Sequence, residues 1–149
     1  MSNLATLANA YNPILLLISL GLGVFLGIKY KSARVVLLVL SAVVVYSIMF
    51  LDNKFKLWGG MGLDYSTHTA TSLAMCIFIG TSIRNTVMNI ILALTLGGYC
   101  ALMVALNYHS WADILSTAAV VGVLLSVLYY SANSSIYFRA RKLPSDELI

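Results

Sequence analysis

Charged residues are scarce in this sequence. Only 9% of its 149 residues are Asp, Glu, Lys or Arg, whereas 60% are hydrophobic and the mean hydropathy is +0.92. A soluble domain is about one-quarter charged and close to half apolar, so this chain carries more apolar surface than a core of its own can bury. The composition therefore excludes an ordinary soluble domain and predicts an integral membrane protein.

Cysteine is also sparse, with two residues, as is proline. Cys76 and Cys100 both fall within apolar runs, which indicates small buried side chains rather than a disulfide or a zinc site. The net charge is +4, but the cations are scattered in short segments between apolar runs, so they do not predict nucleic-acid binding. The N-terminus lacks the charged region of a cleavable signal peptide, and we expect the first apolar run to be retained.

Five apolar runs have the length of membrane helices, and none alternates as the strands of a barrel do. The expected fold class is all-α, a single transmembrane domain over residues 1–149. Asn12-Pro13 predicts the start of the first helix, because proline favours the first helical position, and Ser66 or Asp64 is expected to cap the third. The expected spans are 13–28, 33–51, 66–83, 86–106 and 111–131, followed by a tail at 132–149.

The cations divide unevenly between the two ends of this predicted bundle. The end that holds the C-terminal tail carries seven of them, namely Lys29, Lys31, Arg34, Arg84, Arg139, Arg141 and Lys142. The other end carries only Lys54 and Lys56. Short loops rich in Lys and Arg stay in the cytoplasm, so the N-terminus is expected outside and the C-terminus in the cytoplasm.

Both histidines of the chain fall at the expected outer end. His68 lies in the first turn of the third helix, and His109 directly precedes the fifth. Asp113 follows His109 by four residues, a spacing that places two side chains on one face of a helix. Ionisable groups near a bilayer are costly to keep, so the three residues together predict a functional site. Arg84 is expected at the opposite end and is excluded from it.

Several chemistries are compatible with this set. In phosphoryl transfer, one imidazole attacks phosphorus, a carboxylate holds its tautomer, and a second histidine protonates the leaving oxygen. The side chains expected to bind the phosphate are Lys54, Lys56, Ser66, Thr67 and Ser110. A His-His-Asp metal site and the proton relay of a transporter would use the same histidines. A purely structural role remains, in which His68 and His109 are interfacial polar residues paired for packing and the hydroxyl residues cap helices.

At these residues the sequence resembles the type 2 phosphatidate phosphatase superfamily of membrane lipid phosphatases, including its sphingomyelin-synthase-like branch. The family pattern is K-x6-R-P, then P-S-G-H, then S-R-x5-H-x3-D. Ser66-Thr67-His68 stands at S-G-H, Thr69-Ala70 is similar to its continuation in that branch, and residues 109–113 match H-x3-D. The chain has no Arg-Pro, and Met103 stands where the family has an arginine before the H-x3-D histidine.

The resemblance implies that His109 forms a phosphohistidine, that Asp113 orients it, and that His68 is the general acid for the leaving alcohol. The implied function is a phosphatase or phosphotransferase acting on a phospholipid or other lipid phosphate ester without a metal or cofactor. Its site would face outside, towards the periplasm or a lumen, from an inner or plasma membrane. The alternative is a metal-binding or non-enzymatic membrane protein, such as a transporter or assembly partner, and a homo-oligomer is compatible with either.

Overall fold

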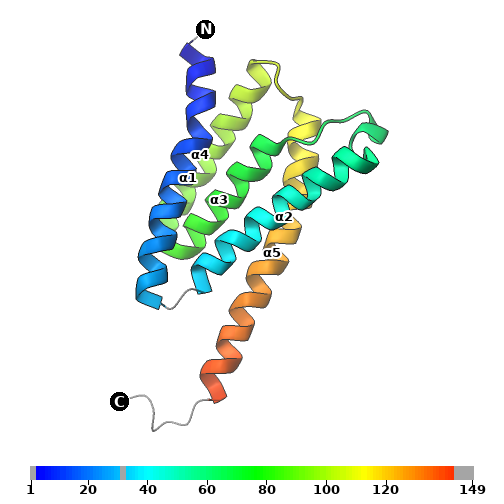
Figure 1. Ribbon diagram of the computed structural model, residues 1–149. Coiled ribbons are helices and arrows are strands. Elements are labelled where there is room, and N and C mark those ends of the chain that lie inside the picture. The colour runs from blue at the N-terminus through cyan, green and yellow to red at the C-terminus, as the bar shows by residue number, and fades with distance from the viewer. Residues whose placement is uncertain (1–2, 31–32, 143–149) are drawn as a thin grey trace.

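The computed structural model of the protein describes residues 3–30 and 33–142. These residues form five α-helices and one 3-10 turn, and no strand occurs among them (Figure 1). The elements are α1 (Asn3–Tyr30), α2 (Ala33–Phe55), η1 (Gly59–Met61), α3 (Thr67–Ile83), α4 (Thr86–Ala105) and α5 (Trp111–Lys142). The predicted all-α bundle is confirmed. Lys31 and the end of the predicted tail, residues 143–149, lie outside the described residues.

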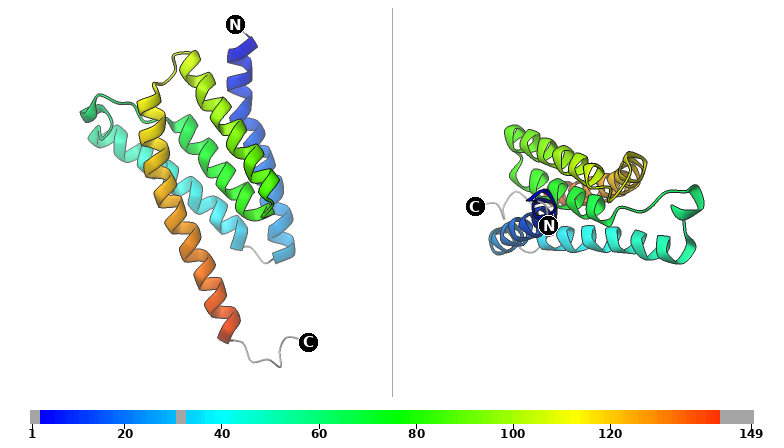
Figure 2. Two further views of the ribbon diagram at one scale, coloured as in Figure 1. Left: turned by 180° about the vertical axis from the view of Figure 1, so that it is seen from behind. Right: turned by 90° about the horizontal axis from the view of Figure 1, so that it is seen from above.

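The central helix of the bundle is α3. It packs against α1, α2, α4 and α5, and it lies among them in both Figure 1 and Figure 2. Nine of its 17 residues are buried. Glycine at position 80 lets α3 approach α4 closely. A Cβ at this position would lie 2.5 Å from Oδ1 of Asn89 on α4, which is too close for two atoms that are not bonded. Side chains of α3 therefore line the grooves on the surface of the bundle.

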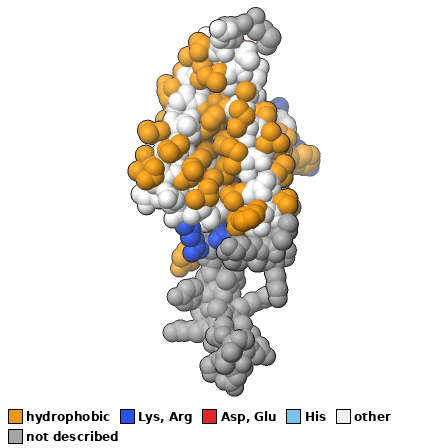
Figure 3. All heavy atoms as spheres, turned by 90° about the vertical axis from the view of Figure 1, so that its left-hand side faces the viewer, with side chains coloured by type: hydrophobic (Ala, Val, Ile, Leu, Met, Phe, Trp, Pro, Cys, Tyr) orange, Lys and Arg blue, Asp and Glu red, His pale blue; other side chains and the backbone are white. Residues whose placement is uncertain are grey.

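The surface has the polarity of a membrane bundle. Within the part of the chain that the structure describes, α1, α2, α4 and α5 are long and apolar enough to cross a membrane. Apolar side chains cover much of the face in Figure 3, and Lys and Arg appear at its edges. The predicted membrane protein is confirmed at this level. With 17 residues, α3 is shorter than the roughly 20 residues that a span needs.

The start of α1 differs from the prediction. The helix begins at Asn3, and Pro13 lies inside it. Proline has no N–H, so the carbonyl of Asn9 loses its intrahelical donor, and an interior proline disfavours a helix by about 3 kcal/mol. Contact with α4 offsets this cost, because the rings of Tyr11 and Tyr99 stack with centroids 4.3 Å apart. The residues before the proline are thus held in the helix by packing rather than by local propensity.

The connection between α2 and α3 folds back onto α5. Oδ1 of Asp52 accepts a hydrogen bond from the backbone N–H of Trp58 at 2.8 Å. The indole Nε1 of Trp58 then donates to Oγ of Ser116 on α5 at 2.9 Å. Gly62 closes the turn with φ at 71°, a conformation that glycine adopts without strain. These contacts bring the chain across the start of α5 before α3 begins.

Candidate functional site

His68 and His109 lie at the same end of the bundle. The first turn of α3 carries His68, and the turn between α4 and α5 carries His109. Both segments lie in the upper half of the ribbon in Figure 1 and in the left view of Figure 2. Burial, and after it the charge of His109, lower the pKa of His68. The chain thus places both of its histidines at one end of the bundle.

The carboxylate of Asp113 is engaged away from His109. Its Oδ1 accepts the N–H of Asp64 at 2.8 Å, and its Oδ2 accepts the N–H and the Oγ–H of Ser110, both at 2.8 Å. Oγ of Ser110 accepts in return from the N–H of Asp113 at 3.2 Å. This exchange is a capping box at the start of α5. The helical spacing that predicted a His109–Asp113 pair does not apply, because His109 precedes the helix.

Asp64 is the carboxylate that lies beside His109. Its Oδ2 is 3.4 Å from Nδ1 of His109, the one ion pair among the described residues. The His109 side chain is 10% exposed, and its Nδ1 is buried without a hydrogen bond. Asp64 was expected only as a helix cap, because no helical spacing in the sequence relates it to His109.

Asn12 of α1 contacts His68. Its Nδ2 lies 3.4 Å from Nδ1 of His68 and donates at 3.4 Å to the His68 carbonyl and to the hydroxyl of Tyr99. Oγ of Ser72 donates to Oδ1 of Asn12 and to the His68 carbonyl. One amide therefore joins α1, α3 and α4 at His68. In the sequence, Asn12 is an amide side chain next to an apolar run. The pair Asn12-Pro13 predicted a helix start there and gave no indication of a contact with His68.

A groove of about 590 Å³ opens beside His68 between α1 and α2, with α3 as its floor. Asn12, Thr67, His68 and Thr71 are polar residues of its lining, and Ser41 of α2 lines it as well. Most of the remaining lining is aliphatic, including Leu16, Leu20, Leu38, Val39, Val45 and Met75. A groove with this distribution fits an amphiphile whose polar group lies next to His68.

The predicted hydroxyl residues have different surroundings. Ser66 is fully buried, and its Oγ caps α3 by accepting the N–H of Thr69 at 3.3 Å. Ser110 belongs to the capping box of α5. Only Thr67 lines the groove together with His68. Capping therefore occupies two of the three hydroxyl side chains that the sequence suggested for substrate binding.

The two lysines are exposed and lie to one side. Lys54 is in the last turn of α2 and Lys56 follows the helix. This end of α2 and η1 stand out from the side of the bundle in both Figure 1 and Figure 2. Nζ of Lys54 lies 5.4 Å from the centroid of the Phe55 ring, and neither lysine forms a salt bridge with a described residue. The structure does not bring them into contact with the histidines.

Metal binding finds no support in the described part of the chain. No group of three or more His, Cys, Asp or Glu side chains is placed there to hold an ion. The site is thus formed by two histidines, the Asp64 carboxylate, the Asn12 amide and an apolar groove. No protein-family model, curated protein or solved structure matches the chain, so these side chains alone bear on its function.

Proposed function

We propose that the protein is a membrane lipid phosphatase or phosphotransferase that acts on a lipid phosphate ester through His109 and His68. The observation that carries the proposal is that His68 lies at the polar end of an apolar groove, with His109, in the turn between α4 and α5, at the same end of the bundle. A lipid phosphate has the same division, with a charged group on an apolar chain. The resemblance of the segments at 66–70 and 109–113 to the type 2 phosphatidate phosphatase superfamily supports the same chemistry.

The first step transfers the phosphoryl group to His109. Nε2 of the neutral ring attacks phosphorus, and the bond from phosphorus to the ester oxygen breaks. Asp64, 3.4 Å from Nδ1, favours the tautomer with the proton on Nδ1 and stabilises the positive charge that the ring develops. Protonated His68 donates its proton to the leaving oxygen. The products are a phosphohistidine and the lipid alcohol.

The second step returns the enzyme to its starting state. A water molecule or a second alcohol attacks phosphorus, and neutral His68 accepts the proton of the attacking hydroxyl. The phosphorus–nitrogen bond breaks, so His109 is again neutral and His68 is again protonated. Water yields inorganic phosphate and an alcohol yields a new phosphate ester. Phosphatase and transferase activity thus differ only in the acceptor.

The phosphate charge needs cations or N–H donors around it. The N-terminus of α3, one residue before His68, supplies a partial positive charge. Lys54 and Lys56, which stand out from the side of the bundle and do not contact the histidines, are not among these groups. The uneven distribution of Lys and Arg favours an orientation in which the site faces outside.

The proposal is tested by phosphate release from lipid phosphates in mixed micelles by the purified protein. His68→Ala is expected to lower the rate about 100- to 10,000-fold, the usual contribution of a general acid. His109→Ala is expected to abolish release and to prevent acid-labile labelling by substrate carrying a radioactive phosphate. Tyr108→Ala, an exposed neighbour of His109, is the matched control and should keep the wild-type rate. Unchanged release by His109→Ala would overturn the assignment.

A further inference from the structure

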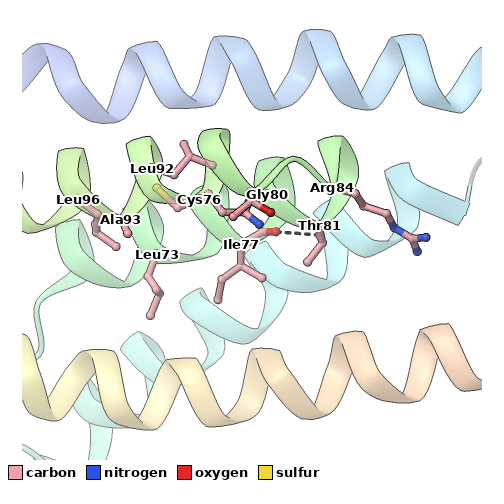
Figure 4. Close-up of a pocket in the computed structure, with 11 residues that line it drawn as sticks. Leu73, Cys76, Ile77, Gly80, Thr81, Arg84, Leu92, Ala93 and Leu96 are labelled. Carbon is pink, nitrogen blue, oxygen red and sulfur yellow. Dashed lines mark hydrogen bonds between the residues drawn. The ribbon is translucent and has the colours of Figure 1, made fainter.

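A second groove lies on another side of α3, towards the end that is opposite His68. It is lined by residues 73–84 of α3 and its C-cap and by residues 86–96 of α4, and we call it the α3–α4 groove. Its volume is about 580 Å³. Its lining comes from α3, from α4 and from the turn that joins them, as Figure 4 shows. At the inner end, the side chain of Leu73 lies next to Gly122 of α5. A Cβ built on this glycine would be 3.8 Å from Cδ2 of Leu73.

The α3–α4 groove has one polar end and one apolar end. Figure 4 shows Arg84 at one end of the row of side chains and Leu73 and Leu96 towards the other. The polar lining is Thr81, Arg84, Thr86 and Asn89, all close to the turn between α3 and α4. None of the lining residues is Asp or Glu. The polar end therefore offers one positive charge and several hydrogen-bond donors, with no competing negative charge.

Arg84 occupies an unusual backbone position. It is the C-cap of α3 with φ at 53°, and its N–H donates to the carbonyl of Gly80 at 3.0 Å. Glycine or asparagine is preferred there, because a Cβ is disfavoured in the left-handed region. The side chain is exposed, and it forms no salt bridge with a described residue. An unpaired guanidinium at a position that favours glycine is consistent with a role for the side chain itself.

We propose that the α3–α4 groove binds an anionic phospholipid, with one acyl chain along its apolar part and the phosphate at Arg84. From Leu73 to Arg84 the helix rises about 16 Å. This is close to half of a hydrocarbon core of about 30 Å, so the groove has the depth of one leaflet. A chain that fills it places its phosphate at the level of Arg84.

The chemistry at the mouth of the groove selects an anionic headgroup. A guanidinium binds phosphate oxygens through paired N–H donors. The hydroxyl of Thr86 and the amide of Asn89 line the same end. The N-terminus of α4 begins there and adds the partial positive charge of a 20-residue helix. The bound lipid is separate from the proposed substrate, because Arg84 and His68 stand at opposite ends of α3.

The test is a lipid titration of the purified full-length protein in detergent, with bound lipids counted by native mass spectrometry. The wild type is expected to bind phosphatidylglycerol more tightly than phosphatidylcholine. Arg84→Gln should weaken phosphatidylglycerol binding roughly fivefold, the usual effect of one cation near a membrane surface, and leave phosphatidylcholine binding unchanged. Arg34→Gln is the matched control, because Arg34 does not line the groove, and it should retain wild-type binding.

Three further measurements locate the lipid. Ala93→Phe keeps the charge but fills the groove, and it should also weaken phosphatidylglycerol binding. Tyr108→Ala, an exposed position that lines neither groove, should not, and millimolar inorganic phosphate should not compete. The proposal would be overturned by equal binding of both lipids to the wild type, by equal losses in Arg84→Gln and Arg34→Gln, or by wild-type binding in Ala93→Phe. Weaker binding by Tyr108→Ala or competition by phosphate would overturn it as well.

Discussion

Replacing Asp113 with alanine separates a structural role of this carboxylate from an orienting role towards His109. The side chain is 8% exposed and accepts three hydrogen bonds, one from the N–H of Asp64 and two from Ser110. None of them reaches His109. The structure therefore predicts that Asp113→Ala lowers stability first and affects phosphoryl transfer only indirectly.

The expected loss of stability follows from these bonds. The N–H and Oγ–H of Ser110, the N-cap of α5, lose their acceptor, which costs about 1 kcal/mol, the size of a typical hydrogen bond. The N–H of Asp64 would also lose its acceptor, which adds about 1–3 kcal/mol if water does not replace it. Together the two effects give about 2–4 kcal/mol. For a chain of this length the melting temperature should fall by on the order of 5–10 °C.

Unfolding can be followed through the two cysteines. Cys76 and Cys100 are free and buried, so a thiol-reactive dye reports their exposure on heating. Asp64→Ala is the matched control, since its carboxylate is 73% exposed and its removal should cost less than about 0.5 kcal/mol. Phosphate release would be measured well below both transitions. There, Asp64→Ala should be the slower variant, because it removes the charge beside Nδ1 of His109.

Two outcomes would refute this reasoning. Equal melting temperatures for Asp113→Ala and Asp64→Ala would show that the capping box does not stabilise α5. If Asp64→Ala released phosphate at the wild-type rate while folded Asp113→Ala was much slower, Asp113 rather than Asp64 would be the residue that orients His109. The pair of variants thus decides between a helix cap and a catalytic partner.

Two other predictions concern Asn12 and Tyr65. Asn12→Ala should lower the rate of phosphate release roughly 10-fold, because a lost hydrogen bond to His68 is worth about 1.4 kcal/mol; an unchanged rate would mean that Asn12 does not position the ring. Burial and the charge of Asp52 raise the pKa of Tyr65 from 10.0 to about 12. Its contribution to stability is therefore fully present below pH 10 and is lost as the pH rises towards 12. In the thiol-dye assay, Tyr65→Phe should lose less stability than the wild type between pH 10 and pH 12, and parallel curves would contradict this.

Local chemistry explains why most helix boundaries were predictable. Ser66 accepts the N–H of Thr69 at the start of α3, and Asn85 accepts the N–H of Met88 at the start of α4. Such caps are encoded by a residue and its near neighbours. The location of both histidines at one end of the bundle was also predictable, because two antiparallel helices separate them and return the chain to the same end.

The details of the site depend on contacts between distant segments. Pro13 is tolerated within α1 because α4 holds the preceding turn, and no local pattern encodes that contact. Asp64 reaches His109 because the connection before α3 crosses the start of α5. The Ser110-x-x-Asp113 pattern of a capping box was present in the sequence. The sequence thus offered two partners for the Asp113 carboxylate, Ser110 in a capping box and His109 one helical turn away. Because α5 starts at Trp111, after His109, the capping box forms.

The length of α3 has a consequence for the surrounding membrane. Its 17 residues span about 25 Å, less than a typical hydrocarbon core of about 30 Å. The polar ends of both grooves, at His68 and at Arg84, are therefore closer together than the two headgroup layers of an undisturbed bilayer. This hydrophobic mismatch is relieved when the bilayer thins beside the groove mouths. The proposed lipid substrate would then reach His68 with less displacement from its own leaflet.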